Sequence, residues 1–261
     1  MRRTWPTSAG RRMADSGYVD AGGLRTYYEV LGDGPPLLLL HGGFGNAASM
    51  MPMASLLARH YRVYIPERRG HGHTADIGEI TYKLMAEDTA AFMQAMGIEK
   101  AHIVGYSDGA IICFYLGMRR PELVEKLVPI SGNFHWNGLS ERSRMIFEKS
   151  TPEAFAAVLG DLVTAYNENS PDGPEHFPVV FAKMQRLFLT EPNLTPEELA
   201  TIQAPTLVLA ADRDLMDIEH TVALHKAIPN SRLCIIAGAN HNLVFDRADG
   251  VCAAVLRFLA V

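Results

Sequence analysis

The sequence predicts an α/β fold in which helices cover both faces of a mostly parallel, twisted β-sheet. Short apolar runs alternate along the chain with longer stretches of helical spacing, as expected when crossover helices join parallel strands. The runs are apolar at successive positions, which is typical of strands buried on both faces. They occupy residues 37–40, 61–66, 101–106, 127–130, 206–210 and 232–236.

A β-hairpin is predicted ahead of this alternation, at residues 17–30, because alternating residues flank the turn sequence Ala21-Gly22-Gly23. Helices are predicted in three further places, at residues 50–59, 81–96 and about 250–259. Together these elements assign two stretches of the chain to a single α/β core, residues 17–132 and 201–261.

Residues 133–200 interrupt the alternation and are predicted to form a helical cap. They contain no strong strand signal, but residues 155–163 and 179–189 have helical spacing and lie between several prolines. At the other end of the core, residues 1–16 carry four arginines and no apolar stretch. We expect a disordered N-terminal extension there and not an export signal.

The composition is that of an ordinary globular chain and excludes several classes of partner. Of the 261 residues, 48% are hydrophobic and 20% are charged, and the net charge is −5. The sequence has no basic stripe with interleaved aromatic residues, so nucleic acid is not an expected partner. No apolar run approaches the roughly 20 residues of a membrane span, so a membrane is not expected either. The three cysteines lie far apart in apolar segments, which predicts reduced thiols in a cytoplasmic protein.

Metal binding is also not expected. His71 and His73 flank a glycine, but no third ligand follows at the spacing of a metal site. The expected protein therefore has no metal and no cofactor, and the sequence is consistent with a monomer or a homodimer.

Ser107 is the predicted nucleophile. It lies at the centre of the sequence Gly-Tyr-Ser-Asp-Gly, which follows the apolar run 101–104 and precedes a helical stretch at 110–118. A strand that turns sharply into a helix strains the central residue, and small neighbours allow the close approach. Such a turn presents the hydroxyl to a cleft at a helix N-terminus, where N–H groups favour developing negative charge.

A serine hydroxyl needs a base near neutral pH, and His241 is predicted to be that base. It follows the last predicted strand, at the carboxyl end, where open α/β sheets place their sites. An acid that orients His241 is expected on the loop after the preceding strand. Three aspartates there are candidates, Asp212, Asp214 and Asp217.

Further motifs resemble the α/β-hydrolase superfamily, and the resemblance covers nearly the whole chain from Gly17 onward. His41-Gly42-Gly43 is similar to the family's oxyanion-loop motif. Residues 66–74 resemble its D-x-R-G-x-G-x-S segment, with Glu67 where Asp is commoner. The resemblance implies the α/β-hydrolase fold, with the family's lid at residues 133–200.

Two later motifs bear on the acid. Residues 204–214 resemble the family's P-T-L-V-L-x-G-x-x-D stretch, with Ala211 in place of Gly, and residues 238–241 resemble its G-x-x-H ending. The carboxylate of the first motif is its last residue, so the resemblance favours Asp214. It also implies an oxyanion hole made of two backbone N–H groups, that of Asp108 and that of Gly43 or Phe44.

Asp108 departs from the commoner pattern, in which an apolar residue or Gln follows the serine. The Gly-x-Ser-Asp-Gly form resembles the valacyclovir-hydrolase-like branch, which implies an acidic residue that can meet a cationic substrate group. The alternative is that the Asp108 carboxylate caps the following helix. Four further residues are candidates for the substrate pocket, His41, Tyr106, His135 and Trp136, the last two because they open the insertion.

These features predict a serine hydrolase that cleaves a carboxylic ester, or a related acyl bond, of a small and fairly apolar molecule. We expect short acyl chains to be accepted. Ser at position 107 argues against the haloalkane dehalogenases and epoxide hydrolases that resemble this family, since they use a carboxylate nucleophile. One alternative is a C–C bond hydrolase or lactonase that uses the same three residues. Another is a lyase, a cofactor-free oxygenase or a ligand receptor of the same fold.

Overall fold

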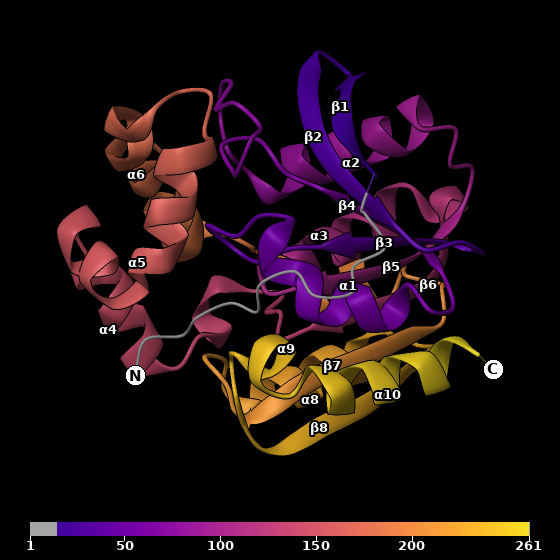
Figure 1. The fold of residues 1–261 in the computed structure, drawn as a ribbon. Coiled ribbons are helices and arrows are strands. Elements are labelled where there is room, and N and C mark those ends of the chain that lie inside the picture. The colour runs from indigo at the N-terminus through magenta and orange to yellow at the C-terminus, as the bar shows by residue number, and fades with distance from the viewer. Residues whose placement is uncertain (1–14, 261) are drawn as a thin grey trace.

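Eight strands form one sheet in a computed structural model that describes residues 15–260 (Figure 1). They are β1 (Asp15–Ala21), β2 (Leu24–Leu31), β3 (Pro36–Leu40), β4 (Arg62–Pro66), β5 (Ala101–Tyr106), β6 (Val124–Ile130), β7 (Thr206–Arg213) and β8 (Ser231–Asn240). Their order across the sheet is β1-β2-β4-β3-β5-β6-β7-β8. β2 pairs antiparallel with β1 and β4, and the other pairings are parallel, which confirms the predicted mostly parallel sheet.

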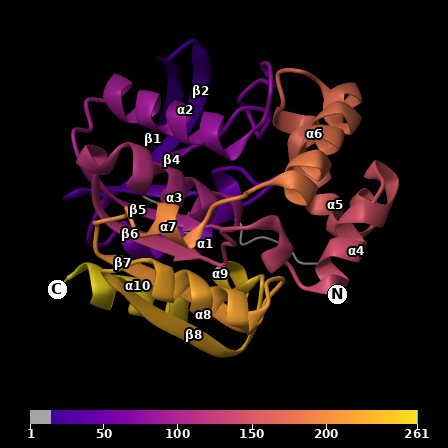
Figure 2. The same cartoon turned by 180° about the vertical axis from the view of Figure 1, so that it is seen from behind.

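Helices cover both faces of this sheet (Figures 1 and 2). One face carries α2 (Tyr82–Ala95), α3 (Asp108–Arg119) and α8 (Ile218–Ala227), and the other carries α1 (Met51–Leu57), α9 (Leu243–Asp246) and α10 (Ala248–Leu259). The burial of β3 on both faces of the sheet explains why its sequence is apolar at successive positions. Leu38 and Leu40 are buried in the core beneath α2 and α3, whereas Leu37 and Leu39 are buried beneath α1 and α10.

Three helices from the predicted cap stand together to one side of the core (Figures 1 and 2). They are α4 (Glu141–Lys149), α5 (Pro152–Asn169) and α6 (Phe177–Thr190). The short α7 (Pro196–Leu199) instead packs against α3 and α8, so the last residues of the predicted cap belong with the core. Within residues 15–260, no helix combines the length and the apolarity that a membrane crossing requires. Short 3-10 helices occupy Ala48–Met50, Pro121–Leu123, Trp136–Gly138 and Pro174–His176.

Two of the cap helices, α4 and α5, begin where the sequence supplies an N-terminal cap. The Ser140 hydroxyl accepts a hydrogen bond from the Ser143 N–H at the start of α4, and the Thr151 hydroxyl accepts one from the Ala154 N–H at the start of α5. Each bond satisfies a backbone donor that the helix itself leaves without a partner. Pro152, directly after the Thr151 cap, has its fixed φ angle at a position where helices tolerate it.

The N-terminal boundary of the core differs from the prediction. Asp15 and Ser16, which the sequence assigns to the extension, begin β1 and pair with Val30 and Glu29 of β2. The remainder of that predicted extension, residues 1–14, lies outside the described residues.

The last strand also differs from the prediction. β8 continues through residues 237–240, beyond the predicted end of the strand at residue 236. The strand is predicted to be buried on both faces, but most of its residues are only half-buried or exposed, because it forms the edge of the sheet. The longer strand places His241 directly after its carboxyl end.

β5 and α3 approach each other closely because two glycines face one another. A Cβ atom at Gly105 would lie 2.1 Å from the Gly109 carbonyl oxygen, and one at Gly109 would lie 2.4 Å from the Leu40 carbonyl oxygen. Both contacts are with backbone, which cannot move aside as a flexible side chain does. The turn between β5 and α3 therefore requires glycine on both sides.

We predict that Gly109→Ala lowers the free energy of unfolding by about 1–3 kcal/mol or more, the usual effect of overpacking. Gly250→Ala is the matched control, because Gly250 is exposed in α10 and a Cβ atom there would have no neighbouring atom within 4 Å. This control should raise the free energy of unfolding by up to about 1 kcal/mol through helix propensity. Chemical denaturation of both variants measures the difference, and a Gly109→Ala variant as stable as the parent protein would contradict the packing argument.

Candidate active site

The backbone at Ser107 has a conformation that L-residues rarely adopt. Its φ is +55° and its ψ is −116°, at the point where β5 ends and α3 begins. Such strained angles persist only where the surrounding structure imposes them, and they cluster at functional sites. Here the close packing at Gly105 and Gly109 imposes the turn. It leaves the Ser107 side chain half-buried in a pocket at the carboxyl end of the sheet.

The structure brings Ser107, His241 and Asp214 together, although they are far apart in the sequence. His241 Nε2 lies 3.1 Å from Ser107 Oγ, and His241 Nδ1 lies 2.6 Å from Asp214 Oδ1. With a neutral imidazole, Nδ1–H donates to the carboxylate and Nε2 accepts from the hydroxyl. The three side chains therefore form a continuous chain of hydrogen bonds.

Four donors hold the Asp214 carboxylate. Besides His241, its Oδ1 accepts from the Leu215 N–H, and its Oδ2 accepts from the Ser131 hydroxyl at 2.5 Å and the Ala211 N–H at 3.2 Å. Burial raises the pKa of the Asp214 carboxyl, but the hydrogen bonds from His241, Ser131 and Ala211 outweigh that effect. Its pKa therefore lies below the ordinary value, and the group is ionised at neutral pH.

Asp212 and Asp217 occupy different positions. The exposed Asp212 carboxylate accepts from the N–H groups of Gly238 and Ala239, near the end of β8. Asp217 precedes the first residue of α8. Of the three candidate acids, Asp214 is the one hydrogen-bonded to the imidazole.

Ser131 belongs to the candidate site through its hydrogen bond to Asp214, and no sequence motif indicates it. It follows the last residue of β6, beside β7, and its φ is +55°. Its position directly after a buried strand could have indicated it, because the carboxyl ends of neighbouring parallel strands meet at one edge of the sheet.

The loop that follows β3 lies against the serine turn. A Cβ at Gly42 would lie 3.0 Å from the Tyr106 ring and 3.3 Å from the Ser107 Cβ, so glycine allows this approach. Phe44 has a φ of +55°, the third left-handed non-glycine residue of the described chain, with Ser107 and Ser131. Gly43, Phe44 and Asp108, the predicted sources of oxyanion N–H groups, all line the same pocket as Ser107.

Arg68 binds the backbone of this loop, and no sequence motif indicates that role. Its guanidinium donates hydrogen bonds to the carbonyl oxygens of His41 and Gly42. The group is buried, which lowers the pKa of Arg68 to about 10, so it remains charged at neutral pH. Since Arg68 is the variable residue of the D-x-R-G segment, the family pattern carries no signal for it.

His41 does not line the pocket, contrary to the prediction. It is fully buried, its Nδ1–H donates to the Gly42 carbonyl oxygen, and its Nε2 accepts from the Arg68 N–H. Burial, followed by the positive charge of Arg68, lowers the pKa of His41 well below its ordinary value. The neutral ring is therefore a structural support of the loop.

Asp108 does not cap α3. Its Oδ1 accepts a hydrogen bond from the Tyr82 hydroxyl at 3.0 Å, and its buried Oδ2 has no hydrogen-bond partner among the described residues. A Cβ at Gly43 would lie 2.8 Å from that Oδ2, so the carboxylate faces the loop after β3. Burial raises the pKa of Asp108, while the positive charge of Arg68 and the Tyr82 hydrogen bond oppose the rise.

The pocket around Ser107 has a volume of about 170 Å³ and lies between the core and the cap. Tyr106 lines it, as predicted, and the Tyr106 hydroxyl donates to the His241 carbonyl oxygen at 2.8 Å. His135 and Trp136 do not line it, which corrects the prediction. They form the start of a 3-10 turn whose Trp136 N–H donates to the Pro192 carbonyl oxygen, and Asn133 and Leu139 on either side reach the pocket instead.

The histidines near glycine 72 take part in other contacts. His73 Nδ1 lies 3.0 Å from Glu67 Oε2, and His71 Nδ1 lies 2.9 Å from the Arg69 carbonyl oxygen. Among residues 15–260, no group of three His, Cys, Asp or Glu side chains is arranged to hold a metal ion.

Comparison with known proteins gives relatives over most of the chain. A protein of Azorhizobium caulinodans provisionally named carbamate hydrolase RutD is 28% identical over 240 residues, which cover 86% of this chain and 91% of the relative. The pimeloyl-(acyl-carrier protein) methyl ester esterase of Aliivibrio salmonicida is 25% identical over 197 residues, covering 73% and 71%.

Solved structures share the fold. A serine hydrolase involved in carbazole degradation, the CarC enzyme, superposes with a TM-score of 0.79 at 24% identity, over 95% of this chain and 99% of that one. At this identity the likeness shows the fold alone.

The family itself follows from a sequence model described as the alpha/beta hydrolase fold, which matches residues 35–168, just over half of the chain. The matched stretch begins just before β3 and includes the serine turn between β5 and α3. The chain is therefore a member of the alpha/beta hydrolase fold family.

Proposed function

We propose that the protein is a serine hydrolase that cleaves a carboxylic ester, or a related acyl bond, of a small molecule. The observation that carries the proposal is the imidazole of His241, hydrogen-bonded to the Ser107 hydroxyl on one side and to Asp214 on the other. This is the arrangement that activates a serine for attack on a carbonyl carbon. The names of the two relatives, a carbamate hydrolase and a methyl ester esterase, support hydrolysis of an acyl bond.

Acylation begins when the Ser107 oxygen attacks the substrate carbonyl and His241 Nε2 takes the hydroxyl proton. The ionised Asp214 holds the Nδ1–H tautomer and stabilises the imidazolium that forms. The backbone N–H of Asp108 and that of Gly43 or Phe44 bind the oxyanion, and one such donor is typically worth about 3 kcal/mol of barrier. His241 then gives its proton to the leaving alcohol, and water hydrolyses the acyl-enzyme by the reverse path.

Two observations in the site bear on its efficiency. The hydrogen bonds to Asp214 fix the carboxylate before substrate arrives, so little reorganisation is needed during the reaction. The Arg68 guanidinium binds the carbonyl oxygens of His41 and Gly42. Because a trans peptide holds its N–H opposite its C=O, these bonds also fix the direction of the N–H groups of Gly42 and Gly43. Both features favour acyl transfer over a role as a ligand receptor.

Ser107→Ala should lower kcat for p-nitrophenyl ester hydrolysis at least about a thousandfold, as removal of the nucleophile does in other serine hydrolases. Steady-state kinetics at saturating substrate measure the loss, with circular dichroism to establish that the variant is folded. Retention of more than a tenth of the parent kcat would exclude Ser107 as the nucleophile.

Asp214→Asn should lower kcat by roughly 10⁴, because the amide no longer holds the required imidazole tautomer. Asp212→Asn is the matched control, two residues away, where the carboxylate binds backbone N–H groups and does not touch His241. The control should keep kcat within about threefold of the parent protein. Equal losses in the two variants would contradict the assignment of Asp214.

An α-amino group on the acyl part of the substrate should bring no gain in rate. Asp108 lines the pocket, but the buried positive charge of Arg68 already offsets the negative charge of its carboxylate. An ammonium group in the pocket would therefore be attracted by Asp108 and repelled by Arg68. The test compares kcat/KM for phenylalanine methyl ester and methyl 3-phenylpropanoate, which differ by that amino group. A preference of tenfold or more for the amino ester that Asp108→Asn removes would instead assign Asp108 to cation recognition.

A further inference from the structure

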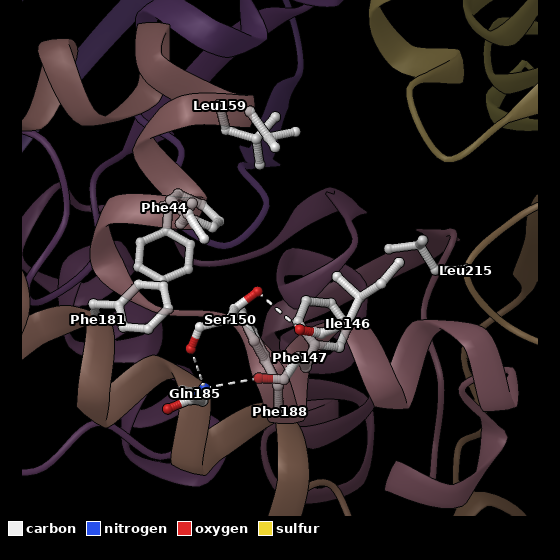
Figure 3. A pocket seen from close by; sticks show the side chains of 12 residues that line it. Phe44, Ile146, Phe147, Ser150, Leu159, Phe181, Gln185, Phe188 and Leu215 are labelled. Atoms are coloured by element: carbon white, nitrogen blue, oxygen red, sulfur yellow. Dashed lines mark hydrogen bonds between the residues drawn. The ribbon is translucent and has the colours of Figure 1, made fainter.

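A second cavity of about 210 Å³ lies inside the cap, between α4, α5 and α6 (Figure 3). Phe44, from the loop after β3, and Leu215, from the loop after β7, complete its wall on the side of the core. α5 departs from helical geometry at this wall, where Leu159 has a φ of −118° and a ψ of 38°. Neither the sequence motifs nor the proposed mechanism accounts for this cavity.

The cavity adjoins the pocket around Ser107. Six residues line both spaces, Phe44, Phe147, Phe155, Leu159, Phe188 and Leu215. Phe44 is central to this boundary, because its ring packs against Phe155 with centroids 4.5 Å apart and against Phe181 at 5.8 Å. The two spaces therefore share one wall of side chains, and Phe44 stands in it.

The lining has almost no polar group available to a ligand. Ten of its twelve residues are apolar, and the other two are Ser150 and Gln185. The Gln185 amide donates to the carbonyl oxygens of Phe147 and Ser150, and the Ser150 hydroxyl donates to the Ile146 carbonyl oxygen (Figure 3). Since these polar groups are engaged with the protein, the cavity suits a hydrocarbon group.

The side chains at the rim support the same conclusion. Val158 is 80% exposed, Ile146 51% and Leu159 42%, and all three line the cavity. Apolar side chains gathered at an opening are typical of ligand-binding grooves. A hydrocarbon group that enters the cavity would remove part of this apolar protein surface, and its own apolar surface, from water.

The position of the cavity indicates which part of an ester it would take. The leaving alcohol must lie near His241, which returns the proton to it. His241, Asn242 and Phe245 border the pocket around Ser107 but not the cavity. Phe44, by contrast, has its ring in the cavity wall and its N–H among the candidate oxyanion donors. A carbonyl held there directs its acyl substituent, not its alcohol, toward the cap.

We propose that this cavity binds the far end of the substrate's acyl chain, and that the natural substrates are esters of medium-chain or arylalkyl carboxylic acids. The proposal rests on the proposed serine hydrolase function. Apolar cavities of about 150 Å³ bind benzene, so this one accommodates a group of about eight carbon atoms. The sequence leads us to expect that short acyl chains are accepted, and this proposal adds that longer ones are preferred.

The first experiment varies one side of the ester at a time. In p-nitrophenyl acetate, butanoate, hexanoate and octanoate the leaving group is constant, and kcat/KM should rise at least tenfold from acetate to octanoate. A fully buried methylene contributes up to about fourfold, from about 0.8 kcal/mol. In ethyl, butyl and hexyl acetates the alcohol varies instead, and kcat/KM should stay within about threefold. A flat acyl series, or a rise confined to the alcohol series, would overturn the proposal.

The second experiment fills the cavity. Ala154 is exposed on α5 and lines the cavity, whereas Ala157 is exposed on the same helix and lines neither space. Ala154→Trp should lower the octanoate-to-acetate ratio of kcat/KM at least tenfold, and Ala157→Trp should leave that ratio unchanged. Equal ratios in the two variants would contradict the assignment. Melting temperatures and fluorophosphonate labelling establish that both variants are folded.

A binding measurement without hydrolysis tests the cavity proposal independently of the serine hydrolase proposal. Calorimetry should show octanoate binding at least tenfold more tightly than butanoate to the parent protein, and Ala154→Trp should remove that difference. If no ester is hydrolysed and Ser107 is not labelled, the serine hydrolase proposal fails, and this measurement alone decides on the cavity. Equal affinities for butanoate and octanoate would contradict the cavity proposal.

Discussion

The left-handed backbone at Ser107 is the constraint on which the rest of the site depends. An L-residue at a φ of +55° is costly, and it persists here because Gly105 and Gly109 let β5 and α3 approach within contact of backbone atoms. The same turn sets the direction of the hydroxyl and places the Asp108 N–H at the start of a helix, where it has no intrahelical acceptor. The proposed nucleophile and one candidate oxyanion donor therefore come from one local geometry.

The sheet supplies the other parts of the site by bringing loop ends together. β3, β5, β6, β7 and β8 run parallel, so the segments that follow them meet at one edge. Phe44, Ser107, Ser131, Asp214 and His241 each follow a different one of these strands. The cap then covers this edge, and the cluster of aromatic rings around Phe44 links the cap to the loop that carries the candidate oxyanion donors.

Much of the fold could be predicted from the sequence, because most residues of the central strands are apolar and buried, on both faces of the sheet, as Leu37 to Leu40 illustrate. The edge strand β8 is predicted too short, since its exposed end lacks that signal. Ser107, Asp214 and His241 follow strands in recognisable motifs. Arg68 and Ser131 form hydrogen bonds to residues distant in the sequence, and His135 and Trp136 do not line the pocket. Tertiary contacts that no local pattern encodes decide these positions.

The proposed mechanism requires the imidazole of His241 to activate Ser107 and no other serine of the chain. Labelling with a fluorophosphonate, followed by peptide mapping, tests it most directly, because the reagent reacts with a serine only where a base activates it. We expect one adduct per chain, on Ser107, and a strongly slowed reaction when His241 is replaced by Ala. A folded protein that takes up no label, or that takes it up at another residue, would show that His241 does not activate Ser107.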